Sequence, residues 1–376
     1  MKNYIYADNA ATTQLDLDAL NLMMPYLLAE YGNASQPYSF SRQPKKAIQE
    51  ARNTIASCIG AFPEEIFFTS GGTESDNWVI KGMALSDVNK GTIITSAFEH
   101  HAILHSCSVI ERLQYPVVYL QPGQDGQVTP QIMMDSINCN PRLVSVMLAN
   151  NEIGSIQPIE ELSKIAHSHN ALFHTDAVQA VGHIPVNVKN LDVDMLSASA
   201  HKFNGPKGIG FLYVRKGVDL PPFIDGGAQE YGMRAGTENI ASIVGMAVAL
   251  KKNTDNIFKN MEKVKELESS FLKGLRSRGV TFVRNGGNNT LPGLVSLSFD
   301  GHDGEAILHR LDLMGISISM GSACNGRRTE VSHVLKAIGL RDSLSKGTIR
   351  VSLGKNNTQD DVDAIVKGLD KILNEI

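Results

Sequence analysis

Residues 194–214 read DMLSASAHKFNGPKGIGFLYV, and this stretch contains two of the seven short apolar runs that decide the fold. From Phe62 to Val214 such runs alternate with helical patterns, which indicates a doubly wound α/β sheet. Most runs lack an alternation of apolar and polar residues, as expected for strands covered by helices on both faces. The last run, with glycine on both sides of its first isoleucine, is the candidate for an antiparallel strand. The seven runs are EIFFTS, GTIITS, PVVYL, LVSVML, ALFHTD, DMLSAS and GIGFLYV.

The pattern changes after Thr237. An apolar helix is expected near 240–250, followed by a charged amphipathic pattern over 251–279 that is typical of a connector between domains. Beyond it, short runs such as TFVRN and LVSLSFD mix with helical patterns. We therefore predict a large α/β domain at 13–256, with a mainly parallel seven-stranded sheet between helices. A smaller α+β domain is predicted from 1–12 together with 257–376.

The composition favours a globular protein that acts on small molecules. The 376 residues are 42% hydrophobic, enough for two domains, and their net charge of -4 is spread without a Lys/Arg block. No nucleic-acid or membrane footprint is therefore expected. The N-terminus lacks a signal-peptide core, and the longest apolar run, at 240–250, is too short to span a bilayer. The four cysteines form no C-x-x-C pair, which favours a reducing, cytoplasmic location over a disulfide framework or zinc site.

Lys202 follows a predicted strand and lies among small residues and glycines, next to His201. A lysine that forms a Schiff base must sit in a partly desolvated pocket, where its amine can be neutral when it attacks a carbonyl. Small neighbours let a ring and a phosphate approach the backbone. The spacing alone also suits an ordinary surface-loop lysine, so this interpretation depends on the other motifs.

The motif TSGGTESDNW at 69–78 places Gly71, Gly72 and Thr73 where a strand gives way to a helix. Backbone N–H groups at such a helix start can hold a phosphate, and Ser199 and His201 are candidates for further contacts. The motif lacks the Walker lysine and the G-x-G-x-x-G spacing, which argues against ATP and dinucleotides. A purely structural Gly-Gly turn is the alternative.

Asp176 ends the run ALFHTD, and Gln179 follows it. A buried carboxylate is costly without a cationic or hydrogen-bonding partner. The protonated pyridine nitrogen of pyridoxal phosphate is such a partner, and the carboxylate would keep the ring an electron sink. The alternative is a helix N-cap.

Two further strand ends carry polar pairs. Of His100 and His101, which follow Glu99, one could stack on a cofactor ring and exchange protons near neutral pH. They could equally bind a metal, although no third ligand has the expected spacing. Asn150 and Asn151 could hydrogen-bond a ring hydroxyl or a substrate carboxylate, or could form a turn.

Cys324 lies between Gly321 and Gly326, with Arg327 and Arg328 close behind. Small neighbours suggest an exposed, mobile cysteine, and nearby cations favour its thiolate. The other three cysteines lie in apolar helical or uninformative contexts. A reactive nucleophile and an ordinary cysteine are both compatible with this segment taken alone.

Nine motifs occur in the order found in cysteine desulfurases of the NifS/IscS type, which are fold-type I pyridoxal phosphate enzymes of the class V aminotransferase family. The chain resembles this family from about Tyr6 to Gly354. Around Cys324 it departs from the common family pattern at Met320 and at 325–328. The motifs are YADNAATT, TSGGTES, EHHAIL, NNEIGSIQ, HTDAVQ, SASAHKFNGPKGIG, GGAQEYGMRAGTEN, SMGSACNG and IRVSLG.

The resemblance implies a role for each candidate. Lys202 would carry pyridoxal phosphate as a Schiff base, His100 would stack on its ring and act as acid and base, and Asp176 would pair with the pyridine nitrogen. Gln179 and Asn151 would contact the ring hydroxyl, and Arg350 with Asn151 would bind the substrate carboxylate. Cys324 would form the persulfide and is a candidate transient Fe–S ligand; no other metal site is implied. The phosphate would be held by Gly72, Thr73, Ser199 and His201, joined by Thr237 from the other subunit of a homodimer.

The implied reaction converts L-cysteine to L-alanine and transfers the sulfur to an acceptor, such as an Fe–S scaffold or a tRNA-thiolation enzyme. Two other functions remain open on the sequence. A selenocysteine lyase, or another β-eliminating enzyme on the same cofactor site, would not need Cys324. A sulfur-relay scaffold without catalysis would have no use for the cofactor.

Overall fold

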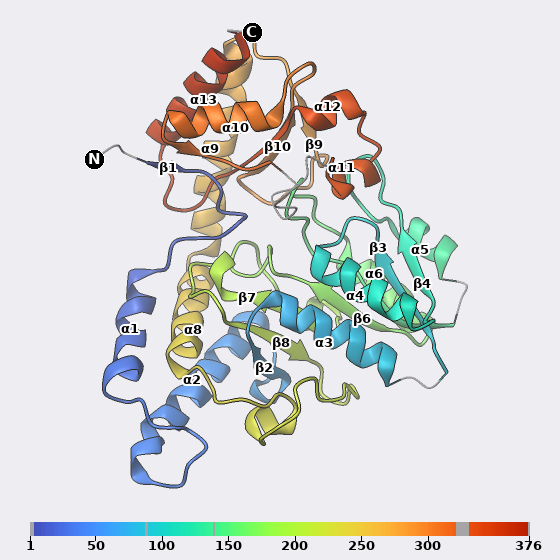
Figure 1. Cartoon of the computed structure of the whole chain (residues 1–376), viewed down its shortest axis with the longest axis vertical. Coiled ribbons are helices and arrows are strands. Elements are labelled where there is room, and N and C mark those ends of the chain that lie inside the picture. The colour runs from blue at the N-terminus through green and yellow to red at the C-terminus, as the bar shows by residue number, and fades with distance from the viewer. Residues whose placement is uncertain (1–3, 87–88, 138–139, 321–330, 375–376) are drawn as a thin grey trace.

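The computed structural model describes residues 4–86, 89–137, 140–320 and 331–374. Within them, a large sheet layered between helices occupies one part of the chain and a smaller α+β unit lies beyond one end of the sheet (Figure 1). Both ends of the chain lie on the side of the smaller unit. No helix among the described residues is long and apolar enough to cross a membrane.

The large sheet has the strand order β2-β8-β7-β6-β5-β3-β4. All neighbours are parallel except those of β8, which is antiparallel to both β2 and β7. Strands β2, β3, β7 and β8 are buried along their whole length, which explains why their sequences lack alternation. The predicted fold class and the antiparallel GIGFLYV strand are confirmed. The strands are β2 (Ile66–Thr69), β3 (Thr92–Ser96), β4 (Val117–Leu120), β5 (Pro141–Ser145), β6 (Leu172–Asp176), β7 (Met195–Ser199) and β8 (Gly210–Val214).

One strand is shorter than its apolar run predicts. The run LVSVML extends to Leu148, but β5 ends at Ser145. Its neighbour β3 ends at Ser96, and the N–H of Met147 donates instead to the side chain of Glu99 at 2.9 Å. The Met147 N–H, just beyond β5, thus bonds to a side chain at the edge of the sheet.

Within the described part of the chain, eight α-helices up to Asp255 flank this sheet. Helices α1, α2 and α8 lie together at one end of it, and α4, α5 and α6 lie at the other (Figure 1). The helices are α1 (Leu17–Leu28), α2 (Arg42–Ile59), α3 (Gly72–Leu85), α4 (His101–Arg112), α5 (Pro130–Ser136), α6 (Ile159–Ser168), α7 (Val188–Leu191) and α8 (Ile240–Asp255).

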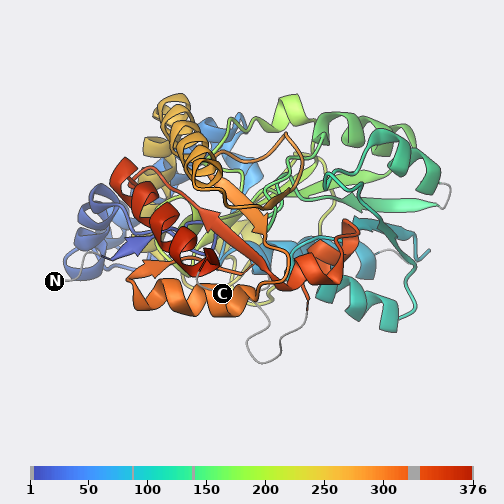
Figure 2. The same cartoon turned by 90° about the horizontal axis from the view of Figure 1, so that it is seen from above.

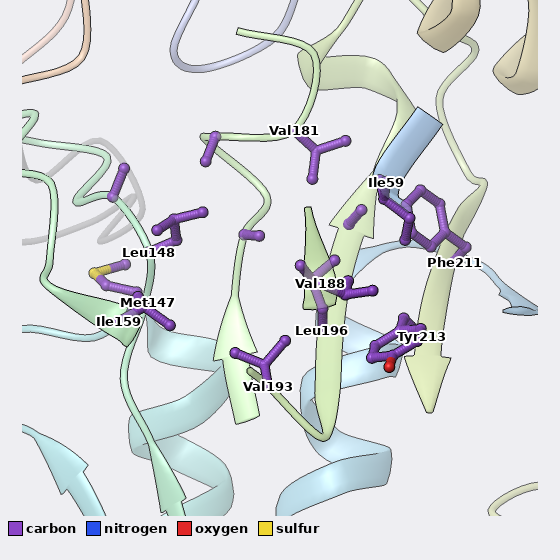
Figure 3. Close-up of a cluster of buried hydrophobic side chains, with 14 of the residues drawn as sticks. Ile59, Met147, Leu148, Ile159, Val181, Val188, Val193, Leu196, Phe211 and Tyr213 are labelled. Atoms are coloured by element: carbon purple, nitrogen blue, oxygen red, sulfur yellow. The ribbon is translucent and has the colours of Figure 1, made fainter. Parts of the chain in front are cut away.

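Apolar side chains from helices and strands fill the space against the sheet. Figure 3 shows Ile59 from the end of α2 beside Phe211 and Tyr213 of β8, with Leu196 of β7 between the layers. Ile59, Leu196 and Phe211 are at most 1% exposed, so their burial contributes on the order of 2 kcal/mol each to stability. This packing holds the strand ends that carry the polar candidates in fixed positions.

The smaller unit has its own apolar core around Phe271, Phe299 and Val351. Helix α9 leads into it from the large sheet, and α10 and α13 lie side by side on its surface (Figures 1 and 2). Its strands β12, β10 and β9 are antiparallel neighbours. The elements are α9 (Ile257–Ser277), β9 (Val283–Asn285), β10 (Leu294–Ser298), α10 (Gly304–Leu313), β11 (Ile316–Ser317), α12 (Asp342–Lys346), β12 (Thr348–Ser352) and α13 (Gln359–Asn374). Helix α11 (His333–Ala337) lies between β11 and α12 in the chain, but its Val334 and Leu335 pack into the core of the large unit.

The N-terminal segment joins both units. Strand β1 (Ile5–Tyr6) pairs in parallel with β11, far along the chain. The N–H of Asn9 then bonds to the Ser352 carbonyl at 3.1 Å, and the N–H of Thr13 to the His201 carbonyl at 2.9 Å. Residues 5–13 therefore run from the small unit across the end of the large sheet to α1.

Candidate active site

The polar candidates meet where the parallel strands end. Asp176 is the last residue of β6, and Lys202 lies in the short turn after β7. His100 follows β3 and caps α4, while Gly72 begins α3 just after β2. In an open α/β sheet, the carboxyl ends of the strands form the ligand-binding edge. The fold thus gathers residues that lie far apart in the sequence, such as Gly72 and Lys202, which are 130 positions apart.

Lys202 is held by the N-terminal segment. Its Nζ donates to the carbonyl oxygens of Ala10 at 2.5 Å and Ala11 at 3.0 Å. Gln179 Nε2 donates to the same Ala10 oxygen at 2.8 Å. Two predicted site residues therefore share one backbone acceptor, which places Gln179 beside the lysine amine.

His100 is a neutral imidazole with a defined acceptor nitrogen. Its Nδ1 accepts a hydrogen bond from the N–H of Ala102 at 3.2 Å. Burial, and then the charge of Lys202 and three neighbouring histidines, lowers the pKa of His100 to about 4. Because Nδ1 is an acceptor, the proton of the neutral ring lies on Nε2.

Asp176 is buried at the carboxyl end of β6. Its Oδ1 accepts from the N–H of Val178 at 2.9 Å. Burial raises the pKa of Asp176 to about 6, against the lowering effects of this hydrogen bond and of Lys202. One ligand atom each of Asp76, His100 and Asp176 lies within 4.8 Å of the others, and burial and Asp176 raise the pKa of Asp76 well above its usual range. A cation placed against Asp176 would favour its ionised form.

The start of α3 forms a cradle beside Ser199 and His201. The first intrahelical backbone bond is that of the Ser75 N–H to the Gly71 carbonyl, so the N–H groups of 72–74 precede the helical ladder. Gly71 has φ 146° and ψ -179°, a conformation that essentially only glycine adopts. A cavity of about 370 Å³ opens here. It is lined by Thr12, Ser70, Gly71, Gly72, Thr73, Glu74, Ser199, His201, Lys207 and Gly208.

The two asparagines behave differently. Asn150 is buried; its Oδ1 accepts from the N–H groups of Glu152 and Ile153, and its Nδ2 donates to the Phe98 carbonyl. These bonds make Asn150 a turn residue. Asn151 is only partly buried, and its backbone carbonyl accepts from Arg350 Nη1 at 2.7 Å.

Arg350 projects from β12 of the small unit towards the same edge. It is 3% exposed, and its Nη2 lies 2.7 Å from Asp8 Oδ1. Its Nε is buried and has no hydrogen-bond partner within the described residues. A guanidinium with an unused buried donor suits a carboxylate ligand.

Two predicted residues are not brought into this cluster by the described chain. Thr237 borders a separate cavity of about 160 Å³, which shares Ser70 and Gly208 with the cradle cavity. Its predicted place in a partner's site stays a prediction. Cys324 lies outside the described residues.

The sequence of the chain matches the family model described as "Aminotransferase class-V" over residues 5–365. This match covers nearly the whole chain and includes the site described above. The chain belongs to the class V aminotransferase family. Its members use pyridoxal phosphate, so the predicted family and cofactor are confirmed.

Within this family the chain is similar to cysteine desulfurases. It is 46% identical to cysteine desulfurase IscS of Dictyoglomus turgidum, with 100% of this chain and 96% of that protein covered. It is 43% identical to cysteine desulfurase IscS of Methanosarcina thermophila, over 99% of this chain and 92% of that one. A solved NifS-like protein superimposes with a TM-score of 0.93 at 36% identity, covering 99% and 100% of the two chains.

A second solved structure shows a relative together with an amino acid. SspA in complex with cysteine superimposes with a TM-score of 0.84 at 36% identity and covers 94% of this chain and 100% of that one. Together these similarities confirm the predicted membership among enzymes of the NifS/IscS type.

The described residues fit the family cofactor. The buried Asp176 carboxylate calls for a cation such as a protonated pyridine nitrogen, and the glycine-rich start of α3 offers N–H groups to a phosphate. A Cβ on Gly72 would lie 2.5 Å from Val178 Cγ2, so the absence of a side chain keeps the cradle next to the Asp176 turn. In space, and not in sequence, Lys202 lies between the Asp176 carboxylate and the start of α3.

Sequence reasoning missed several residues at this edge. Thr12 and Lys207 line the cradle cavity, and Thr12 Oγ1 lies 3.1 Å from His201 Nδ1. Asp8 and the carbonyl groups of Ala10 and Ala11 hold Arg350 and Lys202. The motif YADNAATT contains all of these N-terminal residues and was the available signal, but backbone acceptors have no side-chain signature.

Proposed function

We propose that this chain is a cysteine desulfurase that converts L-cysteine to L-alanine and passes the sulfur through a persulfide on Cys324. The observation that carries the proposal is the meeting of Lys202, His100 and Asp176 beside a phosphate cradle in a class V aminotransferase chain. Family membership supplies the cofactor class, and the named relatives support the reaction.

In this proposal, different residues of the described chain hold different parts of the cofactor. Lys202 would hold the cofactor through its aldehyde, Asp176 would pair with the pyridine nitrogen, and His100 would lie against the ring. When bound, pyridoxal phosphate acts as an electron sink for bonds broken next to the substrate amine. Gln179 and Asn151 reach the ring hydroxyl. The phosphate is held by Gly72, Thr73, Ser199 and His201, and by Thr237 of the partner subunit.

Arg350 binds the substrate carboxylate in this proposal. Support comes from its burial, from its unused Nε donor and from the fixed position that Asp8 and the Asn151 carbonyl give the guanidinium. A charge held in a water-poor place binds an anion more strongly than the same charge in water. Arg350 would thus orient L-cysteine through its carboxylate.

His100 and Lys202 are the proton carriers. The pKa of His100, about 4, keeps its ring neutral at physiological pH. Its Nδ1 accepts a hydrogen bond from the Ala102 N–H. The Nε2–H can therefore be donated, and Nε2 can take a proton back afterwards. The Lys202 amine would be the second proton carrier.

Cys324 supplies the nucleophile. Its thiolate attacks the sulfur of L-cysteine, so that an S–S bond forms while the Cβ–S bond of the substrate breaks. The electron pair leaves with the carbon, which gains a proton and becomes the methyl group of alanine. The thiol of the enzyme becomes a persulfide, and the atoms balance without an external oxidant. The persulfide sulfur then passes to an acceptor protein, for which an Fe–S scaffold or a tRNA-thiolation enzyme is proposed.

The enzyme acts as a homodimer in this proposal. Helix α1 buries Ala19 and Met23 but also leaves a second apolar face exposed. A helix that is apolar on two faces normally has two packing partners. The exposed large side chains on and just after α1 are Leu17, Leu20, Leu22, Met24, Leu27, Leu28 and Tyr31.

A cytoplasmic location is proposed from the thiol chemistry. Cys58 and Cys107 are free thiols, and a persulfide on Cys324 would be lost to disulfide exchange in an oxidising compartment. The location can be tested by fractionating cells and blotting for the chain.

The decisive experiment locates the sulfur. The holoenzyme is incubated with L-cysteine and digested without reductant, and the Cys324 peptide is expected to gain the mass of one sulfur atom. Cys324→Ala should lose alanine production. Cys58→Ala is the matched control, because burial raises the pKa of the Cys58 thiol and makes it a poor nucleophile.

Two results would contradict the proposal. Alanine production by Cys324→Ala with reductant present would favour a selenocysteine lyase or another β-eliminating lyase. Failure of the wild-type chain to bind pyridoxal phosphate would favour a scaffold without catalysis.

A further inference from the structure

Three imidazoles gather just outside the proposed active site. His101 and His105 lie one turn apart on α4, with ring centroids 5.0 Å apart and planes inclined by 25°. His333, at the start of α11, brings its ring to 4.7 Å from that of His101. His101 thus stands between a neighbour on its own helix and one from the C-terminal part of the chain.

None of the three rings is needed by the proposed reaction. His100, which covers the cofactor in that proposal, is a separate residue whose ring centroid lies 6.4 Å from that of His101. Among the described residues, the rings of His101 and His105 have no hydrogen-bond partner. His105 is exposed, and His101 and His333 are partly exposed, so solvent reaches the cluster.

We propose that His101, His105 and His333 form a binding site for a borderline divalent transition-metal ion such as Zn²⁺ or Co²⁺. Two histidines at i and i+4 on one helix face are a common pair of metal ligands, and His333 provides the third imidazole that the sequence spacing does not reveal. Three imidazole ligands leave a further coordination position open to water or to a thiolate.

His333 already has the support that metal-binding histidines usually have. Its Nε2 donates to the Glu99 carbonyl at 2.9 Å, which fixes the ring and leaves Nδ1 to bind a metal. A ligand histidine typically donates its other ring nitrogen to such a carbonyl or carboxylate. The ring nitrogens of the three histidines do not all lie within 4.8 Å of one another in this structure, so metal binding requires a change of rotamer. The exposed His105 side chain can make that change with little steric resistance.

The test measures metal binding, independently of any desulfurase activity. Holoenzyme without a polyhistidine tag is titrated with Co²⁺ and followed by equilibrium dialysis and by the visible d–d absorption of the ion. We expect one Co²⁺ per chain, displaced by Zn²⁺. His105→Ala and His101→Ala should each weaken binding by at least about tenfold, since even groups outside the ligand shell affect affinity on this scale.

Two controls separate this site from others. His309→Ala removes an imidazole with 68% side-chain exposure on α10 and should leave Co²⁺ binding unchanged. Cys324→Ala should also retain it. Equal affinity in wild type and His105→Ala would overturn the proposal, and so would binding that disappears in Cys324→Ala alone. Circular dichroism of each variant checks that it is folded.

Discussion

The Arg350 guanidinium lies 2.7 Å from the Asp8 carboxylate, although 342 positions separate the two residues in the sequence. Arg350 belongs to β12 of the small unit, and Asp8 to the segment that continues towards Ala10 and Ala11. Those two carbonyls hold the Lys202 amine. Arg350, which is proposed to bind the substrate carboxylate, and Lys202, the proposed cofactor lysine, are therefore linked through the four residues 8–11.

The first prediction concerns Arg350→Lys. An ammonium cannot replace the planar fork that donates to Asp8 and Asn151 and, in the proposed function, to L-cysteine. Loss of charge-assisted hydrogen bonds worth about 1.5–3 kcal/mol should lower kcat/KM about 10- to 100-fold, mainly through KM. Steady-state alanine formation measures this. Arg284→Lys is the control, since Arg284 pairs with Glu268 at 2.6 Å away from the site; an unchanged KM in Arg350→Lys would remove Arg350 from substrate binding.

The second prediction concerns Lys202→Ala. Holoenzyme should show the visible absorption of a cofactor bound covalently to lysine, and this band should be absent in the variant because no other amine replaces Lys202. Borohydride treatment followed by peptide mapping should label the Lys202 peptide only. Lys216→Ala, an exposed lysine after β8, serves as the control and should keep the band. A persistent band in Lys202→Ala would transfer the role to another lysine.

The third prediction concerns Glu99, a buried carboxyl group. Burial raises the pKa of Glu99 from 4.5 to about 8. The folded chain therefore binds this proton more tightly than the unfolded chain, so the free energy of unfolding decreases as the pH rises between these values. The slope from this one group is up to about 1.4 kcal/mol per pH unit. Glu99→Gln, which resembles the protonated acid, should remove the slope.

Urea unfolding of the cofactor-free chain at pH 5 and at pH 8 measures the effect of Glu99→Gln. The variant should gain stability relative to wild type at pH 8 but not at pH 5. Glu160→Gln removes an exposed carboxylate and should shift neither value appreciably. Identical pH slopes in wild type and Glu99→Gln would show that Glu99 ionises normally in the folded chain.

The fourth prediction tests the homodimer through Leu28→Asp. Leu28 is 69% exposed at the end of α1, and a twofold interface would bury the new charge twice. The dissociation constant of the dimer should rise at least about tenfold, which corresponds to about 1.4 kcal/mol of association free energy. Sedimentation velocity experiments measure this change. Leu313→Asp, at a leucine 78% exposed on α10, is the control. Equal dimer stability in both variants would exclude the exposed face of α1 as the interface.

The sequence predicted the large sheet well because its strands are buried on both faces and therefore read as continuous apolar runs. The resemblance to NifS/IscS-type enzymes implied that Lys202, Asp176 and His100 share one cofactor, and the structure places them after strands of the same sheet, at one edge. The early end of β5 was not predictable from its apolar run: the N–H groups of Val146 and Leu148 still donate to β6, whereas the N–H of Met147 donates to the Glu99 side chain.

Long-range contacts were the other limit. The Asp8 pair with Arg350 and the approach of His333 to His101 depend on how distant elements pack, and single-sequence patterns carry no such information. Backbone acceptors such as the Ala10 carbonyl leave no trace in residue type. The small and cationic neighbours of Cys324 made it a candidate, and the family resemblance implied its persulfide role, which stays a prediction because Cys324 lies outside the described residues.

The path of residues 5–13 also sets an order for biosynthesis. Strand β1 has its partner in β11, and the Ala10 N–H donates to the Ser352 side chain at 2.9 Å. During synthesis, residues 5–13 must therefore wait until β11 and Ser352 have been made before they can take their final positions. A nascent chain arrested before Ser352 can fold its central sheet, but the Lys202 amine would lack the anchoring that the first residues provide. Full cofactor retention is thus expected only after the chain has been made through Ser352 and the first strand has paired.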